Sequence, residues 1–161
     1  MIVVSNTSPI TNLAAIGHLD ILPKIYGRIL IPQAVYQEIV IDGQGKPGAF
    51  QVRTESWVEN QQVANVALVQ WLEQALNKGE SEAIALAQEL PADLLLIDEA
   101  RGRAMAEQLG LAYTGVLGIL LVAKKQGLFS AIKPLVDDLI QVAGFWVDSR
   151  LYAEVMNFAG E

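Results

Sequence analysis

The stretch VVSNTSPITNL, residues 3–13, passes from a run of apolar β-branched residues through a polar cluster into a helix pattern. Such a run before a polar cluster is typical of a short buried strand. Ser8 before Pro9 is typical of an N-cap followed by proline at the first helical position. Asn6 therefore falls at a strand-to-helix switch, and in open α/β sheets the carboxyl ends of strands are where ligands and catalytic groups are usually held.

The same change from strand pattern to helix pattern recurs along the chain. The segment ADLLLID, residues 92–98, is a continuous apolar run of the kind that is buried on both faces of a parallel sheet. Further strands are predicted at 2–5, 28–31, 57–63 and 111–114, and helices at 9–16, from 18, at 32–41, at 64–77, from 80, at 101–109 and at 115–125. This alternation predicts a three-layer α/β/α sandwich with a central parallel sheet.

The length of 161 residues and the hydrophobic content of 52% predict one domain over residues 1–161. Its core is expected over about 1–127, and a helical extension over about 128–161, with helices at 130–142 and 148–158. The glycine-rich segment 42–48 is predicted to be a surface lid or spacer. Four aromatic residues of the extension are expected to pack within the fold, with packing against a partner as the alternative: Phe145, Trp146, Tyr152 and Phe158.

Composition excludes several classes of function. The chain has no cysteine and one histidine, His18, which we interpret as structural, so a metal ion would have to be held by oxygen ligands. The net charge of -7 argues against a broad basic face for nucleic acid. No signal peptide or membrane-spanning run is visible, which predicts a soluble, cytoplasmic protein with no membrane partner.

Four side chains are expected at the carboxyl edge of the sheet: Asn6, Glu38, Glu80 and Asp98. Their oxygen atoms suit Mg²⁺ or Mn²⁺, which prefer carboxylate and water ligands. Glu80 and Glu82 point about 200° apart on a helix. The apolar residues of that helix place Glu80 on the inward face, so Glu82 is interpreted as an exposed neighbour.

Structural roles are open for each of these residues. Asn6 could serve only the turn, Glu38 could lie on an exposed helix face, and Asp98 could be an N-cap. Glu80 could do no more than compensate a helix dipole. Four cations are candidates for local binding of a polyanion, with solvated helix faces as the alternative: Arg101, Arg103, Lys124 and Lys125.

Five segments resemble the PIN-domain family, in particular relatives of the VapC-like toxin nucleases of toxin-antitoxin pairs. They are VVSNTSP, IPQAVYQEI, GESEAIALA, LLLIDEARGRAMAEQLGL and TGVLGILLVAKKQG, which together span about residues 2–127. The tail KPLVDDLIQVAGFWVDSRLYAEVMN is similar to the ending of an uncharacterised subgroup. The resemblance implies a PIN-like α/β/α sandwich and an Mg²⁺ or Mn²⁺ site of three or four acids that cleaves single-stranded RNA.

The family's first aspartate falls on Asn6, its glutamate on Glu38, and its later acids on Glu80 and Asp98. Asparagine keeps one oxygen ligand but removes a negative charge, which predicts weaker metal binding. The family often has Thr or Ser two residues before the last acid, where this chain has Leu96. Secondary site candidates are Glu82, Thr7, Ser8, Glu99 and Thr114.

Three functions remain open from the sequence. The first is a metal-dependent ribonuclease toxin, with a small antitoxin as its protein partner and a homodimeric state implied by the resemblance. The second is a degenerate, noncatalytic relative that binds RNA or a protein partner. The third is a receiver-like phosphotransfer domain, which is disfavoured because the first strand does not end in a pair of acids.

Overall fold

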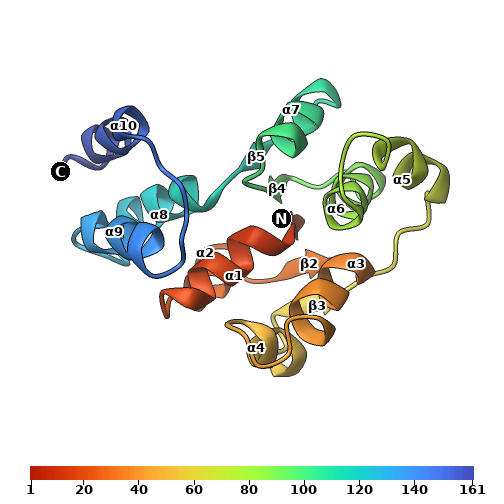
Figure 1. The fold of residues 1–161 in the computed structure, drawn as a ribbon, viewed down its shortest axis with the longest axis horizontal. Helices are drawn as coiled ribbons and strands as arrows, with labels where there is room; N and C mark the ends of the chain where they lie inside the picture. The colour runs from red at the N-terminus through yellow and green to blue at the C-terminus, as the bar shows by residue number, and fades with distance from the viewer.

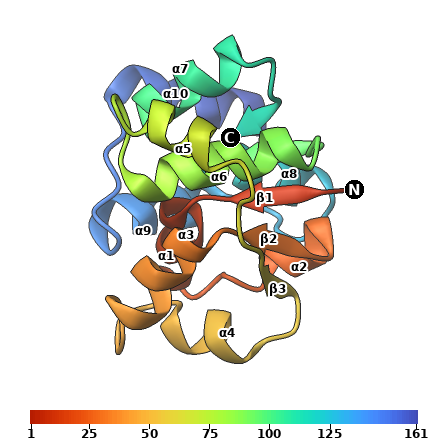
Figure 2. The same ribbon diagram turned by 90° about the vertical axis from the view of Figure 1, so that its right-hand side faces the viewer.

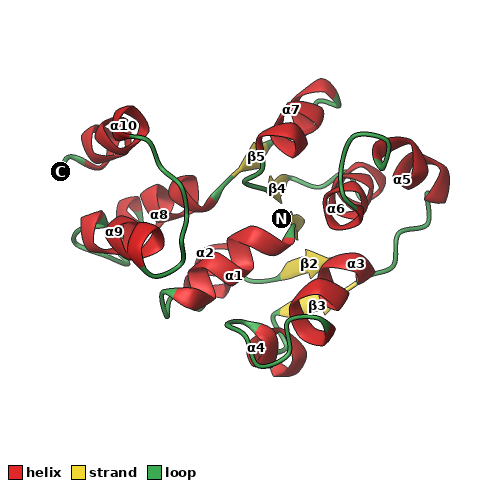
Figure 3. Ribbon diagram, in the orientation of Figure 1, coloured by secondary structure: helices red, strands yellow, loops and turns green.

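Five short strands form one parallel sheet at the centre of the computed structural model, which describes residues 1–161. The strands are β1 (Val3–Ser5), β2 (Ile29–Ile31), β3 (Val58–Asn60), β4 (Leu94–Leu96) and β5 (Tyr113–Thr114). Their order is β3-β2-β1-β4-β5, so β1 is the central strand. Val3 pairs with Leu94 and Ser5 with Leu96. The predicted sandwich with a central parallel sheet is therefore confirmed (Figure 3).

Helices cover both faces of this sheet (Figure 1). They are α1 (Thr7–Ala15), α2 (Ile21–Tyr26), α3 (Gln33–Tyr36), a π-helical turn η1 (Gln37–Ile41), α4 (Ala49–Thr54), α5 (Val66–Leu72), α6 (Lys78–Glu89), α7 (Ala100–Gln108), α8 (Val116–Lys125), α9 (Lys133–Gln141) and α10 (Ser149–Ala159). None of these helices combines the length and the apolar character that spanning a membrane requires.

Two hydrophobic cores lie on opposite faces of the sheet because successive strand residues point in opposite directions. Val3 faces the core shared with α1, α2, α8 and α9, whereas its neighbour Val4 faces the core shared with α5, α6 and α7. Both valines are at most 1% exposed. Figure 1 shows α5 and α6 on one side of the strands and α1 and α9 on the other, and Figure 2 shows the molecule from the α5–α6 side. The central strand is thus fixed from both sides, which holds its carboxyl end in place.

Several elements differ from the sequence prediction. The helix expected to start at Pro9 after a Ser8 N-cap starts at Thr7 instead, and the Ser8 hydroxyl donates to Glu99. The helix predicted to run to Asn77 ends at Leu72, and Asn77 is the N-cap of the next helix. Gly79, expected as a helix stop, is the second residue of α6. The helix α4 lies in a segment for which no element was predicted, since its six residues carry too short a pattern.

The C-terminal extension forms α9 and α10, as the sequence predicts. The expectation that its four aromatic residues pack within the fold is wrong for two of them. Phe145 and Tyr152 pack against the core, but Trp146 is 78% exposed and Phe158 is 79% exposed. Apolar periodicity cannot locate Trp146, because it lies between the helices in a segment without regular structure.

Candidate functional site

The carboxyl ends of β1 and β4 meet at one edge of the sheet. The backbone N–H of Asn6 donates to the carbonyl of Leu96 over 2.9 Å, which continues the ladder between the two strands. Asn6 directly follows β1 and is 3% exposed. Asp98 lies two residues beyond the end of β4. Parallel pairing therefore brings both side chains to the same edge, as the sequence predicts.

Glu38 reaches this edge from the π-helical turn η1. Its carboxylate accepts a hydrogen bond from the hydroxyl of Thr7, the first residue of α1. A β-carbon added at Gly79 would lie 2.5 Å from Glu38 Oε1. The absence of a side chain at the start of α6 therefore leaves the space that this carboxylate occupies.

Glu80 has both a structural position and a place among the acids. Asn77 and Glu80 form a capping box, in which Asn77 Oδ1 accepts from the Glu80 N–H over 2.8 Å and Glu80 Oε1 accepts from the Asn77 N–H over 3.1 Å. Burial raises the pKa of Glu80, the Asn77 N–H lowers it, and the carboxylates of Glu99 and Glu38 raise it further. Glu80 thus has the structural role at the start of α6 that the sequence left open. The same side chain also lies near the carboxylates of Glu99 and Glu38, whose charges raise its pKa.

Asp98 accepts hydrogen bonds from the backbone N–H of Val116, the first residue of α8, over 3.0 and 3.3 Å. Asp98 therefore accepts a bond from the N-terminus of α8. It is not the N-cap of α7, the helix that follows it in the chain, because Glu99 holds that position. A β-carbon at Gly115 would overlap Asp98 Oδ1, so this carboxylate also occupies space left by a glycine. Burial raises the pKa of Asp98 to about 6; the Val116 N–H opposes this rise, and Glu99 adds to it.

The raised pKa of Asp98 predicts a cost in stability near neutral pH. Between about pH 4 and pH 6 the folded chain keeps a proton that the unfolded chain has lost, so the free energy of unfolding falls as the pH rises through this window. In metal-free protein, Asp98→Asn should therefore raise the free energy of unfolding at pH 7 by about 1–3 kcal/mol. Urea unfolding in EDTA at pH 7 and pH 4 measures this. A gain that persists unchanged at pH 4 would mean that burial of the Asp98 charge is not its cause.

Glu99, which the sequence indicates only as a secondary site candidate, lies at the centre of the cluster. Its carboxylate accepts from Asn6 Nδ2 over 3.0 Å and from the hydroxyl of Ser8. These bonds leave Asn6 Oδ1 as the amide atom that a cation could use. The adjacency of Glu99 to Asp98 in the sequence was the available indication, but its partners became visible only once β1 and β4 were paired.

Two secondary candidates serve other parts of the fold. Glu82 is half-buried and accepts from the backbone N–H of Ala34 over 2.9 Å, so its interpretation as an exposed neighbour is wrong. It satisfies a donor at the start of α3, turned away from the acids, because it is two residues further round the helix than Glu80. The Thr114 hydroxyl packs against Gly118 of α8.

The four candidate cations separate into two pairs. Arg101 and Arg103 begin α7, and their charges lower the pKa values of Glu80 and Asp98 respectively. Lys124 and Lys125 end α8, roughly 13 Å along the helix from Val116. Lys124 donates to the carbonyl of Ala159 and forms an ion pair with Glu161 over 2.9 Å. This second pair does not lie beside the acids, and Lys124 instead fastens the C-terminus.

Oxygen donors from four elements thus meet at one edge: Asn6, Glu38, Glu80, Asp98 and Glu99. Every carboxylate is bonded to a donor of the protein, and no three acidic side chains are arranged to hold one metal ion. The chemistry of the donor set still fits a hard divalent cation, since it is all oxygen and strongly negative. An ion would replace bonds to hydroxyl and amide groups. Burial is the main cause of the raised pKa of Glu80, and an ion would also relieve the repulsion from Glu99 and Glu38 that adds to it.

Comparisons with known proteins agree with this architecture. The family model DUF3368, described as a PIN domain, matches residues 2–161, so the chain belongs to the PIN-domain family. A PilT N-terminus domain protein from the hyperthermophilic archaeon Sulfolobus solfataricus P2 has a similar structure, with a TM-score of 0.54 and 21% sequence identity over 76% of this chain and 93% of that one. No curated protein matches. The PIN domain is typically a nuclease fold and generally uses divalent metal ions.

The space left by Gly79 gives a test of the position of Glu38. Gly79→Ala should displace the Glu38 carboxylate and weaken Mn²⁺ binding by about tenfold or more, while helix propensity keeps the fold stable. Ser81→Ala is the matched control, because Ser81 lies in the same helix with a buried hydroxyl that has no partner. Isothermal titration calorimetry compares the two variants. Native affinity in Gly79→Ala would show that Glu38 is not part of a metal site.

Proposed function

We propose that this protein is a divalent-metal-dependent ribonuclease that cleaves single-stranded RNA. The observation that carries the proposal is the gathering of Glu38, Glu80 and Asp98 at the end of the central strands, with two of the three carboxylates in space left by glycines. A stability role alone does not explain it, because burial raises the pKa of both Glu80 and Asp98. Buried acids with raised pKa values are more frequent at functional sites.

Glu38, Glu80 and Asp98 would hold Mg²⁺ or Mn²⁺, together with Asn6 Oδ1. A bound ion of this kind supplies an activated water for in-line attack on the phosphodiester and stabilises the leaving 3′ oxygen. The chain's own hydroxyl groups orient the acids, since Thr7 donates to Glu38 and Ser8 donates to Glu99. Arg101 and Arg103 stand beside the cluster, where they can contact phosphates of the substrate.

We further propose that the protein acts as the toxin of a toxin-antitoxin pair in the cytoplasm, as a homodimer restrained by a small antitoxin. The support for this is the resemblance to VapC-like relatives. A short gene for a DNA-binding protein beside this one would support the pairing.

A degenerate relative that binds RNA or a protein without cleavage is the second candidate. One observation favours it: the amide of Asn6 donates to Glu99. Asn6 thereby stabilises the Glu99 carboxylate of the cluster without a metal ion. The resemblance places Asn6 where the family has its first aspartate. The two candidates therefore differ in metal affinity, because the ribonuclease requires a bound divalent ion and the degenerate relative does not.

The test is cleavage of a fluorescent single-stranded RNA library by the purified native protein in EDTA, Mg²⁺ and Mn²⁺. The ribonuclease proposal predicts cleavage only with a divalent ion, at a higher Mg²⁺ concentration than usual because Asn6 carries no charge. RNA retained without cleavage under all three conditions would favour the degenerate relative. Equal cleavage in EDTA would contradict the metal requirement.

A further inference from the structure

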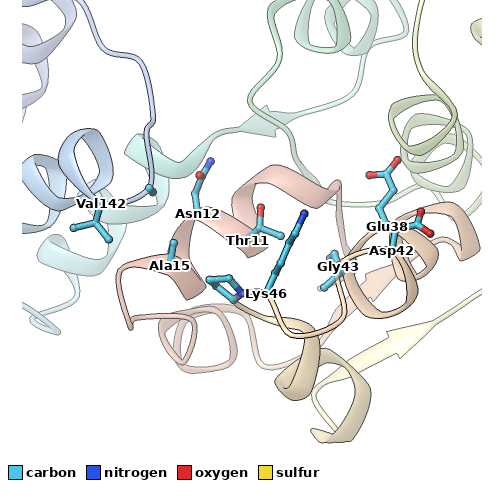
Figure 4. Close-up of a pocket in the computed structure, with 11 residues that line it drawn as sticks. Thr11, Asn12, Ala15, Glu38, Asp42, Gly43, Lys46 and Val142 are labelled. Carbon is cyan, nitrogen blue, oxygen red and sulfur yellow. The ribbon is translucent and has the colours of Figure 1, made fainter.

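Two neighbouring cavities lie along α1 and share Asn12 as a lining residue. The larger, of about 520 Å³, runs from Glu38 to the Asp42–Gly48 loop, from which Lys46 extends across it (Figure 4). The smaller, of about 310 Å³, is bounded by Asp98 and Glu99 on one side and Trp146 on the other. Together the two cavities make a path that passes Glu38 on one side of Asn12, and Asp98 and Glu99 on the other.

Trp146 is the one large aromatic side chain that is both strongly exposed and beside the acids. Its neighbour Phe145 packs against the core and fixes the segment between α9 and α10, so the indole is held outward on an anchored turn. A tryptophan with 78% of its surface in water stabilises the monomer little. Its position therefore suggests a binding role.

The net charge of the molecule restricts the ways in which a nucleic acid could bind at these cavities. With a net charge of -7, this protein lacks the broad electrostatic attraction that most nucleic-acid-binding proteins use. A single strand that approaches the acids must gain affinity from local contacts. Stacking of an unpaired base on an aromatic ring supplies such a contact without requiring positive charge. Lys46, which forms none of the chain's ion pairs, can meet one phosphate further along the same path.

We propose that Trp146 is a stacking platform for one unpaired base of the RNA substrate, next to the phosphate that lies at the acids, and that Lys46 contacts a phosphate on the other side. This inference rests on the ribonuclease function proposed above. It assigns the C-terminal extension a part in substrate binding, because the extension supplies Trp146. Unpaired bases are required, so the path selects single strands over duplexes.

The test compares Trp146→Ala, Trp146→Phe and the control Phe158→Ala. Phe158 is equally exposed, at 79%, but lines a separate cavity beside Lys124 and Lys125. Fluorescence anisotropy with a labelled single-stranded RNA is measured in Ca²⁺, and a denaturing gel confirms that the RNA stays intact. Trp146→Ala should weaken binding about 5- to 150-fold, whereas Trp146→Phe should lose only a few fold and Phe158→Ala nothing.

The outcomes distinguish this inference from the function on which it rests. If native protein cleaves RNA and Trp146→Ala binds RNA as tightly as native, the stacking role is wrong while the ribonuclease stands. If a duplex of the same sequence binds as tightly as the single strand, stacking is also excluded. If native protein neither binds nor cleaves RNA, both proposals fall. If Trp146→Ala loses binding to a co-expressed protein but binds RNA as native protein does, this surface is a protein-docking site and the RNA assignment is overturned.

Discussion

Asp98→Asn should lower the rate of single-stranded RNA cleavage by about a hundredfold or more. The substitution keeps the size of the side chain and an oxygen that can accept from the Val116 N–H, so the end of β4 and the start of α8 should stay in place. It removes the negative charge that would balance a divalent ion. Loss of outer partners of metal ligands already costs about 10–100-fold, and loss of a charged ligand should cost more.

Glu107→Gln is the matched control for this experiment. Glu107 is an exposed acid of α7 whose contact is with the Tyr113 hydroxyl at 3.5 Å, and it makes no bond to the site residues. The control removes one unit of negative charge from the molecule without touching the acids. Equal losses in the two variants would mean that overall charge, and not the site, governs cleavage.

Asn6→Asp should have opposite effects with and without metal. In EDTA the new carboxylate faces Glu99, loses the 3.0 Å hydrogen bond and adds repulsion, so the free energy of unfolding should fall by about 1–3 kcal/mol. With Mn²⁺ present, the added charge should tighten the dissociation constant by roughly ten- to thirtyfold. Urea unfolding and calorimetric titration measure the two effects on the same preparation.

Cleavage by Asn6→Asp then decides between the two candidate functions. Faster cleavage than native, from a native protein that already cleaves, would place Asn6 as an attenuator of an active ribonuclease. Cleavage that appears only in the variant would make the native protein a degenerate relative. A variant that binds metal no better than native would show that Asn6 does not take part in the site.

The arrangement of the sheet could be predicted because the strand residues form apolar runs that can be recognised in the sequence. Apolar runs such as residues 94–97 have to be buried on both sides, and parallel strands need helical crossovers, so the places of Asn6 and Asp98 follow from chain order and packing. Helical phase likewise separated Glu80 from Glu82, since only one of them can share the buried face of α6.

Features that depend on contacts between distant segments could not be predicted in this way. The bond from Ala34 to Glu82 joins residues 48 positions apart, and the bonds of Glu99 to Asn6 and Ser8 cross more than 90 positions. The pairing of Lys124 with Glu161 depends on how the last helix docks. The exposure of Trp146 depends on a turn without periodicity, where hydrophobic character alone suggests burial.

Binding of a divalent ion by Glu38, Glu80 and Asp98 at the carboxyl edge of the sheet is the property on which the proposed ribonuclease depends. Mn²⁺ binding to native protein and to Asp98→Asn, followed by electron paramagnetic resonance, measures this property without requiring a substrate. We expect one or two bound ions in the native protein, competed by Mg²⁺, and a large loss of this binding in Asp98→Asn. No bound Mn²⁺ in the native protein, or equal binding in the two proteins, would contradict the proposed metal site.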